Sequence, residues 1–525
     1  MKRSLSVLWD AGAAAHLLSR AAFASTPREA ALLAAQPLEK AVDELLDTAA
    51  AAQPPSPPDW VKVPWVNTER VYQDTTAEER RENHRKTGER QTRERNQLRC
   101  WWLKEMISGP APLREVMTLF WHGHFTTAIN KVFISQAIYE QNVTLRKYAF
   151  GSFREFLKAI TLDGAMMLYL DMEDSDRQKP NENYARELLE LFTLGEGNYS
   201  ERDIKEVARA LTGWTLDAPA GTPPKPKAPS DAPRSFARDG LTAKFLPEHH
   251  DNGTKTILGR TGNLGVDDVV DILACQDQTG RFLAGKMITF FGTSDPDNAL
   301  RERMARAYRE SGHAIRPMVR ELLVSPELYA PASRSNQIKS PVQLLVGACR
   351  QLQLDVEPTP LLAETTAAMG QELFRPPNVK GWPGGKDWIS TGTLAVRYHL
   401  PESLLDGKEP AGLEPIGRER FLTLPADPVA RRDLLKRLEQ FDDQRKRERR
   451  EGGIKTRFIP ARLFSEGIPD TPEAVVDAML SHLLVVPPRP ETRSTLIEAC
   501  RAVSKADRPA QVARLILMMP EYQIA

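Results

Sequence analysis

The stretch NENYARELLELFTLGEGNYSERDIKEVARALTGW, residues 181–214, constrains the fold of this chain more than any other. Its apolar residues recur at the three- and four-residue spacing that places them on one side of an α-helix. Two glycines interrupt the pattern at positions 195 and 197, and Ser200 followed by Asp203 is a capping box that starts a new helix. We therefore expect two amphipathic helices joined by a turn.

The same periodicity dominates the rest of the 525 residues, and alternating strand patterns are scarce. We expect a mainly α fold, a multi-helix orthogonal or bundle-like array with a small β-hairpin and loops rich in proline and glycine. In residues 68–108 Arg and Glu alternate before Trp101 and Trp102, which predicts a solvated helix that docks through its C-terminal end. No run approaches the roughly 18 apolar residues of a membrane span.

Stretches rich in proline or in charge divide the chain into five predicted units. They are an N-terminal helical segment with a Pro-rich connector (1–60), a central helical region (61–215), a Pro-rich insert (216–240), a second helical region (241–400), and a charged connector followed by C-terminal helices (401–525).

Composition narrows the class of function. The chain has 71 basic and 70 acidic residues, so we expect no nucleic-acid partner. The four cysteines match no metal or redox spacing and predict buried thiols in a reduced protein, with two disulfides as the alternative. They are Cys100, Cys275, Cys349 and Cys500.

The N-terminus has a basic start and small residues that are typical of a secretory signal. However, Asp10, His16 and Arg20 break any apolar core of the roughly 7–15 residues that a signal requires. We expect a structural first helix instead, and from it a cytoplasmic location.

The polar face of the first helix in the opening stretch carries Arg186, Glu187 and Glu190. Two carboxylates at i and i+3 can chelate a metal or share a proton, and the arginine can tune either role. The alternative is an exposed face with a local Arg–Glu pair, which the pattern alone favours. Asn181 and Asn183 are better explained as turn and capping residues than as ligands.

Two histidines lie in the segment PLREVMTLFWHGHFTT. On a helix His122 and His124 diverge by about 200°, so a shared metal requires non-helical backbone here. The alternative is a pair of histidines packed among aromatic residues, each with one ring nitrogen satisfied by a backbone carbonyl.

A second histidine cluster lies in FLPEHHDNGTKTILG, where Asp251, Asn252 and Gly253 predict a turn between two short strands. His250 with Asp251 suits a metal or a general base oriented by a carboxylate, and Lys255 suits an anion. A structural hairpin tip is the alternative.

The segment MGQELFRPPNVKGWPGGKDWIS, residues 369–390, is too rich in proline and glycine for regular structure. Trp382 and Trp388 offer flat surfaces that could stack on a sugar or a partner. The other interpretation, a loop that plugs a gap between helical layers, is slightly favoured.

These segments, with AAHLLSRAAFASTPRE and IKSPVQLLVGACRQL, occur in the order seen in the bacterial domain-of-unknown-function family 1800, which the chain resembles from about residue 14 to its end. Gly164 departs from the family's usual Asp-Pro-Ala-Met, and the insert at 216–235 is this chain's own. The resemblance implies a mostly helical protein. It also implies a partner encoded nearby that resembles the sulfatase and alkaline-phosphatase superfamily, and export as the alternative to a cytoplasmic location.

The polar positions that recur in the family raise the expectation that the separate motifs converge. They correspond to His122, His124, Asn181, Glu182, Asn183, Arg186, Glu187, Glu190, His250, Asp251 and Lys255.

The leading hypothesis is a hydrolase-type enzyme, metal-assisted or acid/base, that acts on an anionic or glycan-like substrate. The predicted catalytic residues are His122, His124, Glu187, Glu190, His250 and Asp251. The predicted substrate-binding residues are Asn181, Asn183, Arg186, Lys255, Trp382 and Trp388. A divalent metal ion would be held by His122, His124, Glu187 and His250. The rival is a non-catalytic interaction or scaffold protein whose polar motifs are buried networks, and a third idea is a sugar-binding module.

Overall fold

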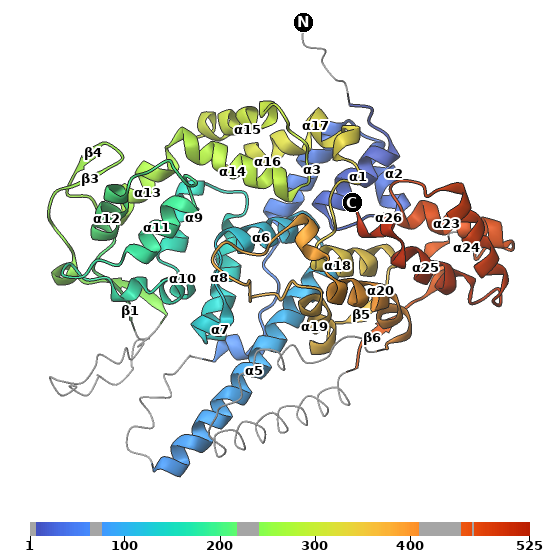
Figure 1. Cartoon of the computed structure of the whole chain (residues 1–525), viewed down its shortest axis with the longest axis horizontal. Helices are drawn as coiled ribbons and strands as arrows, with labels where there is room; N and C mark the ends of the chain where they lie inside the picture. Colours follow the sequence, from blue (N-terminus) through green and yellow to red (C-terminus); the bar gives the residue numbers. More distant parts are fainter. Residues whose placement is uncertain (1–6, 64–75, 218–240, 409–452, 465–466) are drawn as a thin grey trace, which may run out of the picture.

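The computed structural model describes residues 7–63, 76–217, 241–408, 453–464 and 467–525. Helices dominate it, as the sequence predicts (Figure 1). The N-terminal half contains α1 (Ala11–Ala21), α2 (Pro27–Ala34), α3 (Leu38–Ala51), α5 (Ala77–Ser108), α6 (Pro112–His124), α7 (Ile129–Val132), α8 (Ser135–Tyr148), α9 (Phe153–Thr161), α10 (Gly164–Tyr169), α11 (Glu182–Glu190) and α12 (Glu201–Ala210).

The remaining helices cover the second half of the chain. They are α13 (Val266–Ala274), α14 (Asp277–Phe290), α15 (Ala299–Glu310), α16 (Ile315–Leu323), α17 (Pro326–Tyr329), α18 (Pro341–Gln351), α19 (Pro360–Ala368), α20 (Thr391–Asp406), α23 (Pro472–Leu483), α24 (Pro490–Arg501), α25 (Arg508–Met518) and α26 (Pro520–Gln523). Short 3-10 turns are η1 (Asp59–Lys62), η2 (Met172–Asp174), η3 (Pro247–His249), η4 (Pro331–Ser333), η5 (Gly385–Trp388) and η6 (Pro460–Leu463).

Strands form three two-stranded antiparallel sheets within the described residues. The pairs are β1 (Trp214–Asp217) with β2 (Thr242–Phe245), β3 (Lys255–Ile257) with β4 (Arg260–Gly262), and β5 (Asp355–Glu357) with β6 (Lys455–Arg457). The hairpin predicted around Asp251 is therefore wrong, because β2 and β3 belong to different sheets. The segment 249–255 links the two sheets, and its Asp251 contacts Arg209 of α12.

The opening stretch forms α11 and α12 as expected. Asn181 caps α11, accepting from the backbone N–H of Asn183 at 2.9 Å. Ser200 and Asp203 form the predicted capping box at the start of α12. The turn between the helices passes through Gly195 with φ +80°, a backbone conformation that favours glycine.

Within the described part of the charged region a helix begins at Ala77, after a capping box of Thr76 and Glu79. Residues 68–75 of the predicted helix lie outside the described residues. α5 has 32 residues, and its buried side chains begin only at Leu98. Figure 1 shows the earlier turns of α5 projecting away from the rest of the molecule. The prediction of a solvated helix docked through its C-terminal end is confirmed, because Trp102 is fully buried.

α6 lies at the centre of the core and is buried around nearly its whole circumference. Its Trp121 packs edge-on against Phe156 at 5.0 Å between ring centroids, and Phe125 packs against Phe156 at the same distance. α5 and α6 are joined by a buried polar contact in which Trp102 Nε1 donates to Glu115 Oε2 at 2.8 Å. Glu115 in turn pairs with Arg146 at 2.6 Å, so this buried charge is compensated.

The polar residues of the N-terminal segment have structural roles in and around α1. Asp10 caps α1, accepting from the Ala13 N–H at 2.8 Å. His16 and Arg20 are buried, with His16 Nε2 3.0 Å from the Leu328 carbonyl and Arg20 Nη2 donating to the Ser333 carbonyl at 2.9 Å. The polar residues that interrupt a signal-like pattern are therefore part of the core.

Some predictions fall on residues outside the described part. The Pro-rich insert is described only at Leu216 and Asp217, which belong to β1, and residues 409–452 of the charged connector lie outside as well. The five predicted unit boundaries stay predictions. No helix among the described residues has the length and apolar character needed to cross a bilayer.

Candidate functional site

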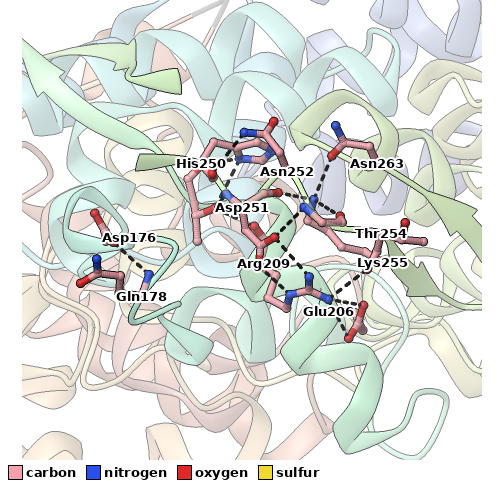
Figure 2. Close-up of polar contacts among 12 residues, drawn as sticks. Asp176, Gln178, Glu206, Arg209, His250, Asp251, Asn252, Thr254, Lys255 and Asn263 are labelled. Atoms are coloured by element: carbon pink, nitrogen blue, oxygen red, sulfur yellow. Dashed lines mark hydrogen bonds and ion pairs between the residues drawn. The ribbon is translucent and has the colours of Figure 1, made fainter. Parts of the chain in front are cut away.

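Most of the predicted site residues lie in two groups of contacts, whereas Asn181, Asn183 and Arg186 make local contacts outside both. The first surrounds the C-terminal end of α6, where α11 and the Trp382 loop also contribute. The second is the loop from His249 to Lys255, which lies against α12 (Figure 2).

The His122 ring is surrounded by aromatic side chains. The helix continues through His124, so the two rings leave α6 in different directions. The His122 ring centroid is 5.4 Å from those of Trp102 and Phe374 and 5.3 Å from that of Trp382. Burial lowers the pKa of His122 to about 3. The ring is therefore neutral at physiological pH, and its buried Nε2 has no hydrogen-bond partner among the described residues.

His124 faces other neighbours. Its Nε2 lies 3.1 Å from the Phe192 carbonyl, so Nε2 carries the proton and donates it. Its ring centroid is 4.5 Å from that of Phe125. Burial, with a smaller contribution from the Lys286 charge, holds the pKa of His124 well below its usual range. This arrangement matches the structural alternative, a histidine among aromatic rings with one nitrogen bonded to a backbone carbonyl.

The tryptophan loop covers the end of α6. Trp382 is half-buried against His122, and Trp388 is 6% exposed beside Gly370. Gly381 has φ +88°, and a Cβ there would lie 2.4 Å from the Gly123 carbonyl oxygen. The loop therefore packs on the end of α6, with Trp388 buried and Trp382 half-buried, as expected for a loop that plugs a gap between helices.

Three polar residues of α11 and its cap serve local structure. The Asn181 amide donates to the Asp171 carbonyl at 2.6 Å, and the Asn183 amide lies 3.5 Å from the Leu170 carbonyl. Arg186 makes a two-pronged pair with Glu201 at 2.8 and 2.9 Å on the surface. This pair joins the middle of α11 to the start of α12.

The two carboxyls of α11 differ in their surroundings. Glu190 Oε2 accepts from the Tyr199 hydroxyl at 2.9 Å. Glu187 is half-buried, and no hydrogen-bond donor within the described ranges contacts its carboxyl. Burial and the neighbouring Glu190 raise the pKa of Glu187, while Lys380 of the tryptophan loop and Arg186 act in the opposite direction.

Arg209 of α12 organises the second group of contacts. Its Nε donates to Asp251 Oδ2 at 2.7 Å and its Nη2 to Asp251 Oδ1 at 3.1 Å. Nη1 contacts Glu206 at 3.0 Å, and Glu206 also accepts from the Thr256 N–H at 3.0 Å. Asp251 Oδ1 further accepts from the Gly253 N–H at 2.8 Å. Because of Arg209, the pKa of Asp251 is lowered.

Lys255 is 1% exposed, and its ammonium group donates hydrogen bonds to backbone carbonyls of its own loop. Its Nζ donates to the carbonyls of Asp251 at 2.5 Å and Gly253 at 3.1 Å, and to Asn263 Oδ1 at 3.3 Å (Figure 2). An ammonium has three protons to donate, and all three have acceptors here. Lys255 therefore has no proton left for an external anion.

The two histidines of this loop are anchored as well. His250 is 8% exposed, and its Nδ1 lies 2.9 Å from the Thr212 carbonyl. His249 Nδ1 contacts the Asp176 carboxylate, which follows η2 in the chain. Both rings tie the loop to neighbouring elements.

Comparison with known families adds one finding. Residues 16–524 match the family model described as Protein of unknown function (DUF1800). The chain belongs to this family. No curated protein and no solved structure matches it.

For this DUF1800 chain the structure gives no support to the predicted metal ligands. Among the residues that it describes, no group of three or more His, Cys, Asp or Glu side chains could hold a metal ion. His122 and His124 have different ring neighbours, and His250 faces Thr212 and Phe245. The predicted divalent ion stays a prediction.

Sequence reasoning missed several polar partners. Asp203, Glu206 and Arg209 recur every three residues along α12, and each contacts the segment 251–258. That spacing on one helix face was a usable signal for a polar contact surface. Lys286 and Lys380, the basic residues beside His124 and Glu187, come from distant segments with no comparable signal.

Proposed function

We propose that this DUF1800 chain is a non-catalytic interaction protein whose polar motifs hold its helices and loops together. The observation that carries the proposal is the network of Arg209, Asp251, Glu206 and Lys255, whose charged groups are bonded to one another or to backbone. Catalytic groups must be free to exchange partners with a substrate. Those in this network are already occupied.

The buried histidines support the same proposal. His122 and His124 are each 1% exposed, and burial keeps both rings neutral. A neutral ring sealed among aromatic residues reaches no substrate. These side chains instead specify how α6 packs against the tryptophan loop and the segment that follows α11.

The first turns of α5 are the proposed contact surface. They are exposed, polar on all sides and held by local ion pairs such as Arg85 with Glu82 at 2.6 Å and Arg85 with Glu89 at 2.5 Å. A helix of this kind stands free in solvent or bridges to another body. On the family resemblance, the proposed partner is a sulfatase- or alkaline-phosphatase-like protein encoded nearby. A cytoplasmic location and export are the two proposed locations of the protein.

Co-elution of the full chain with that neighbouring protein on size exclusion tests the proposal. A double charge reversal in these first turns, Arg81→Glu with Arg85→Glu, should abolish co-elution. Arg493→Glu, which changes an exposed pair with Asp477 on α24 and α23, is the matched control and should leave it intact. Absence of any complex, or a complex that tolerates the α5 reversals, contradicts the proposal.

A second candidate function is acid/base hydrolysis centred on Glu187. It rests on one observation, a half-buried carboxyl with a raised pKa beside Glu190 and Lys380. Such a carboxyl suits proton transfer, and Lys380 would receive an anionic or glycan-like substrate. Nitrophenyl phosphate, sulfate and glycoside substrates test it, with elemental analysis for the predicted divalent ion. Glu187→Gln must abolish any turnover without lowering Tm, whereas Glu196→Gln serves as the exposed control.

A further inference from the structure

One thiol of this chain differs from the other three. Cys275 is exposed, Cys349 and Cys500 are buried, and Cys100 is half-buried. Burial raises the pKa of Cys100 and Cys349 to about 12. The expectation of four buried thiols is therefore wrong for Cys275, and Cys100 meets it only in part.

Cys275 lies beside an imidazole. Its Sγ is 4.0 Å from Nδ1 of His313, at the long end of the range for a hydrogen bond that involves sulfur. Cys275 ends α13 just before α14, and His313 follows α15, so 38 residues of chain separate the two groups.

The backbone holds the His313 ring in place. His313 has φ +70°, in the left-handed region that few non-glycine residues adopt. Its N–H donates to the Tyr308 carbonyl at 2.8 Å, and its carbonyl accepts from the Phe153 N–H at 2.9 Å. The ring also packs edge-on against Tyr308 at 5.0 Å. Both backbone groups of His313 are thus hydrogen-bonded, and its ring is packed against Tyr308.

Burial, more than the surrounding charges, leaves the His313 ring neutral. Burial and Arg154 of α9 lower the pKa of His313, and Asp277 of α14 acts in the opposite direction. Arg154 is paired with Asp271, and Asp277 with Arg309 at 3.2 Å. At neutral pH the imidazole therefore has a lone pair that can accept a proton.

We infer that Cys275 and His313 form a reactive thiol–imidazole pair, and that Cys275 is a site of reversible modification by low-molecular-weight disulfides. The proton of Sγ passes to Nδ1 of His313, and Sγ attacks one sulfur of the disulfide. A new S–S bond forms to Cys275 while the original S–S bond breaks, and the second sulfur leaves as a thiolate. Cys275 is oxidised and the small disulfide is reduced, so electrons balance.

The aromatic disulfide 5,5′-dithiobis(2-nitrobenzoic acid) is the probe, applied to the full native chain. We expect one fast equivalent of released thiolate, with peptide mapping that places the adduct on Cys275. Cys275→Ser should remove the fast phase. His313→Asn, chosen because Asn tolerates a left-handed backbone, should slow it at least about threefold at pH 7 and change its dependence on pH.

His399→Asn, a change at a partly exposed histidine of α20, is the matched control and should leave the rate unchanged. Circular dichroism and Tm of each variant establish that it is folded. A fast phase that survives Cys275→Ser overturns the inference. So does a folded His313→Asn protein whose rate and pH profile equal those of the wild type.

Discussion

The Arg209–Asp251 pair gives the most specific prediction for the polar network. Arg209→Gln and Asp251→Asn each remove the charge of one partner, and the double variant removes both. The asparagine introduced by Asp251→Asn keeps an oxygen for the Gly253 N–H, so the cycle isolates the interaction with Arg209. We expect each single change to weaken the attachment of the 250–258 loop to α12.

The magnitude follows from burial and geometry. The side chains are 28% and 18% exposed, and two parallel hydrogen bonds join them at 2.7 and 3.1 Å. Exposed pairs contribute about 0–1 kcal/mol, whereas breaking a fully buried pair costs about 3–5 kcal/mol. We expect a coupling free energy of about 1.5 kcal/mol between these limits, which is roughly a tenfold change in an equilibrium constant.

Hydrogen exchange read by mass spectrometry is the assay, because a chain of this size need not unfold in two states. Peptides that cover 203–213 and 250–258 report the local opening free energy. The control cycle is Arg186→Gln with Glu201→Gln, an equally two-pronged pair whose side chains are 39% and 69% exposed. It should give about 0.5 kcal/mol or less.

Two results would refute the reasoning. One is a coupling for Arg209 and Asp251 that is no larger than that of the exposed control. The other is a coupling of the expected size that is seen in only one of the two peptides, because a network that joins the loop to the helix must protect both from exchange.

Three further changes test other parts of the account. Burial raises the pKa of Asp163 to about 7, so ionisation of this carboxyl destabilises the fold increasingly as pH rises from about 4 to about 7. Asp163→Asn should therefore be more stable than the wild type by up to about 4 kcal/mol at the upper end of that range. Tm measured at pH 5 and at pH 8 should show a larger advantage of the variant at pH 8. His122→Phe removes a buried nitrogen that has no partner among the described residues, so the free energy of unfolding should stay unchanged or rise by about 1 kcal/mol. A large loss of stability would show that Nε2 has a partner that the fold needs. Gly381→Ala, which adds a Cβ 2.4 Å from the Gly123 oxygen at positive φ, should lower Tm, while Gly384→Ala, with open space around it, should not.

Local chemistry made much of the fold predictable. Ser200 with Asp203 starts α12 because a capping box is encoded within four residues. The long α5 was predictable because its charges alternate and its tryptophans cluster at one end. Such signals need no knowledge of the rest of the chain.

The candidate site was less predictable because its contacts are long-range. Asp251 pairs with Arg209, 42 residues earlier, and Glu187 interacts electrostatically with Lys380. His16 and Arg20 interrupt the signal-like apolar pattern in the sequence, and in the structure they are buried against the carbonyls of residues 328 and 333. The local pattern around a polar side chain does not reveal which distant backbone carbonyls will converge on it, because those carbonyls lie hundreds of residues away in the chain.

Thermal unfolding of Lys255→Met tests most directly whether the polar motifs are structural. Methionine fills similar space but leaves the Asp251 and Gly253 carbonyls and the Asn263 oxygen without their buried donor. We predict a loss of about 2–3 kcal/mol, seen as a lower Tm and as lost exchange protection across residues 250–258. An unchanged Tm and unchanged protection, together with loss of a measurable hydrolytic activity, would contradict the account.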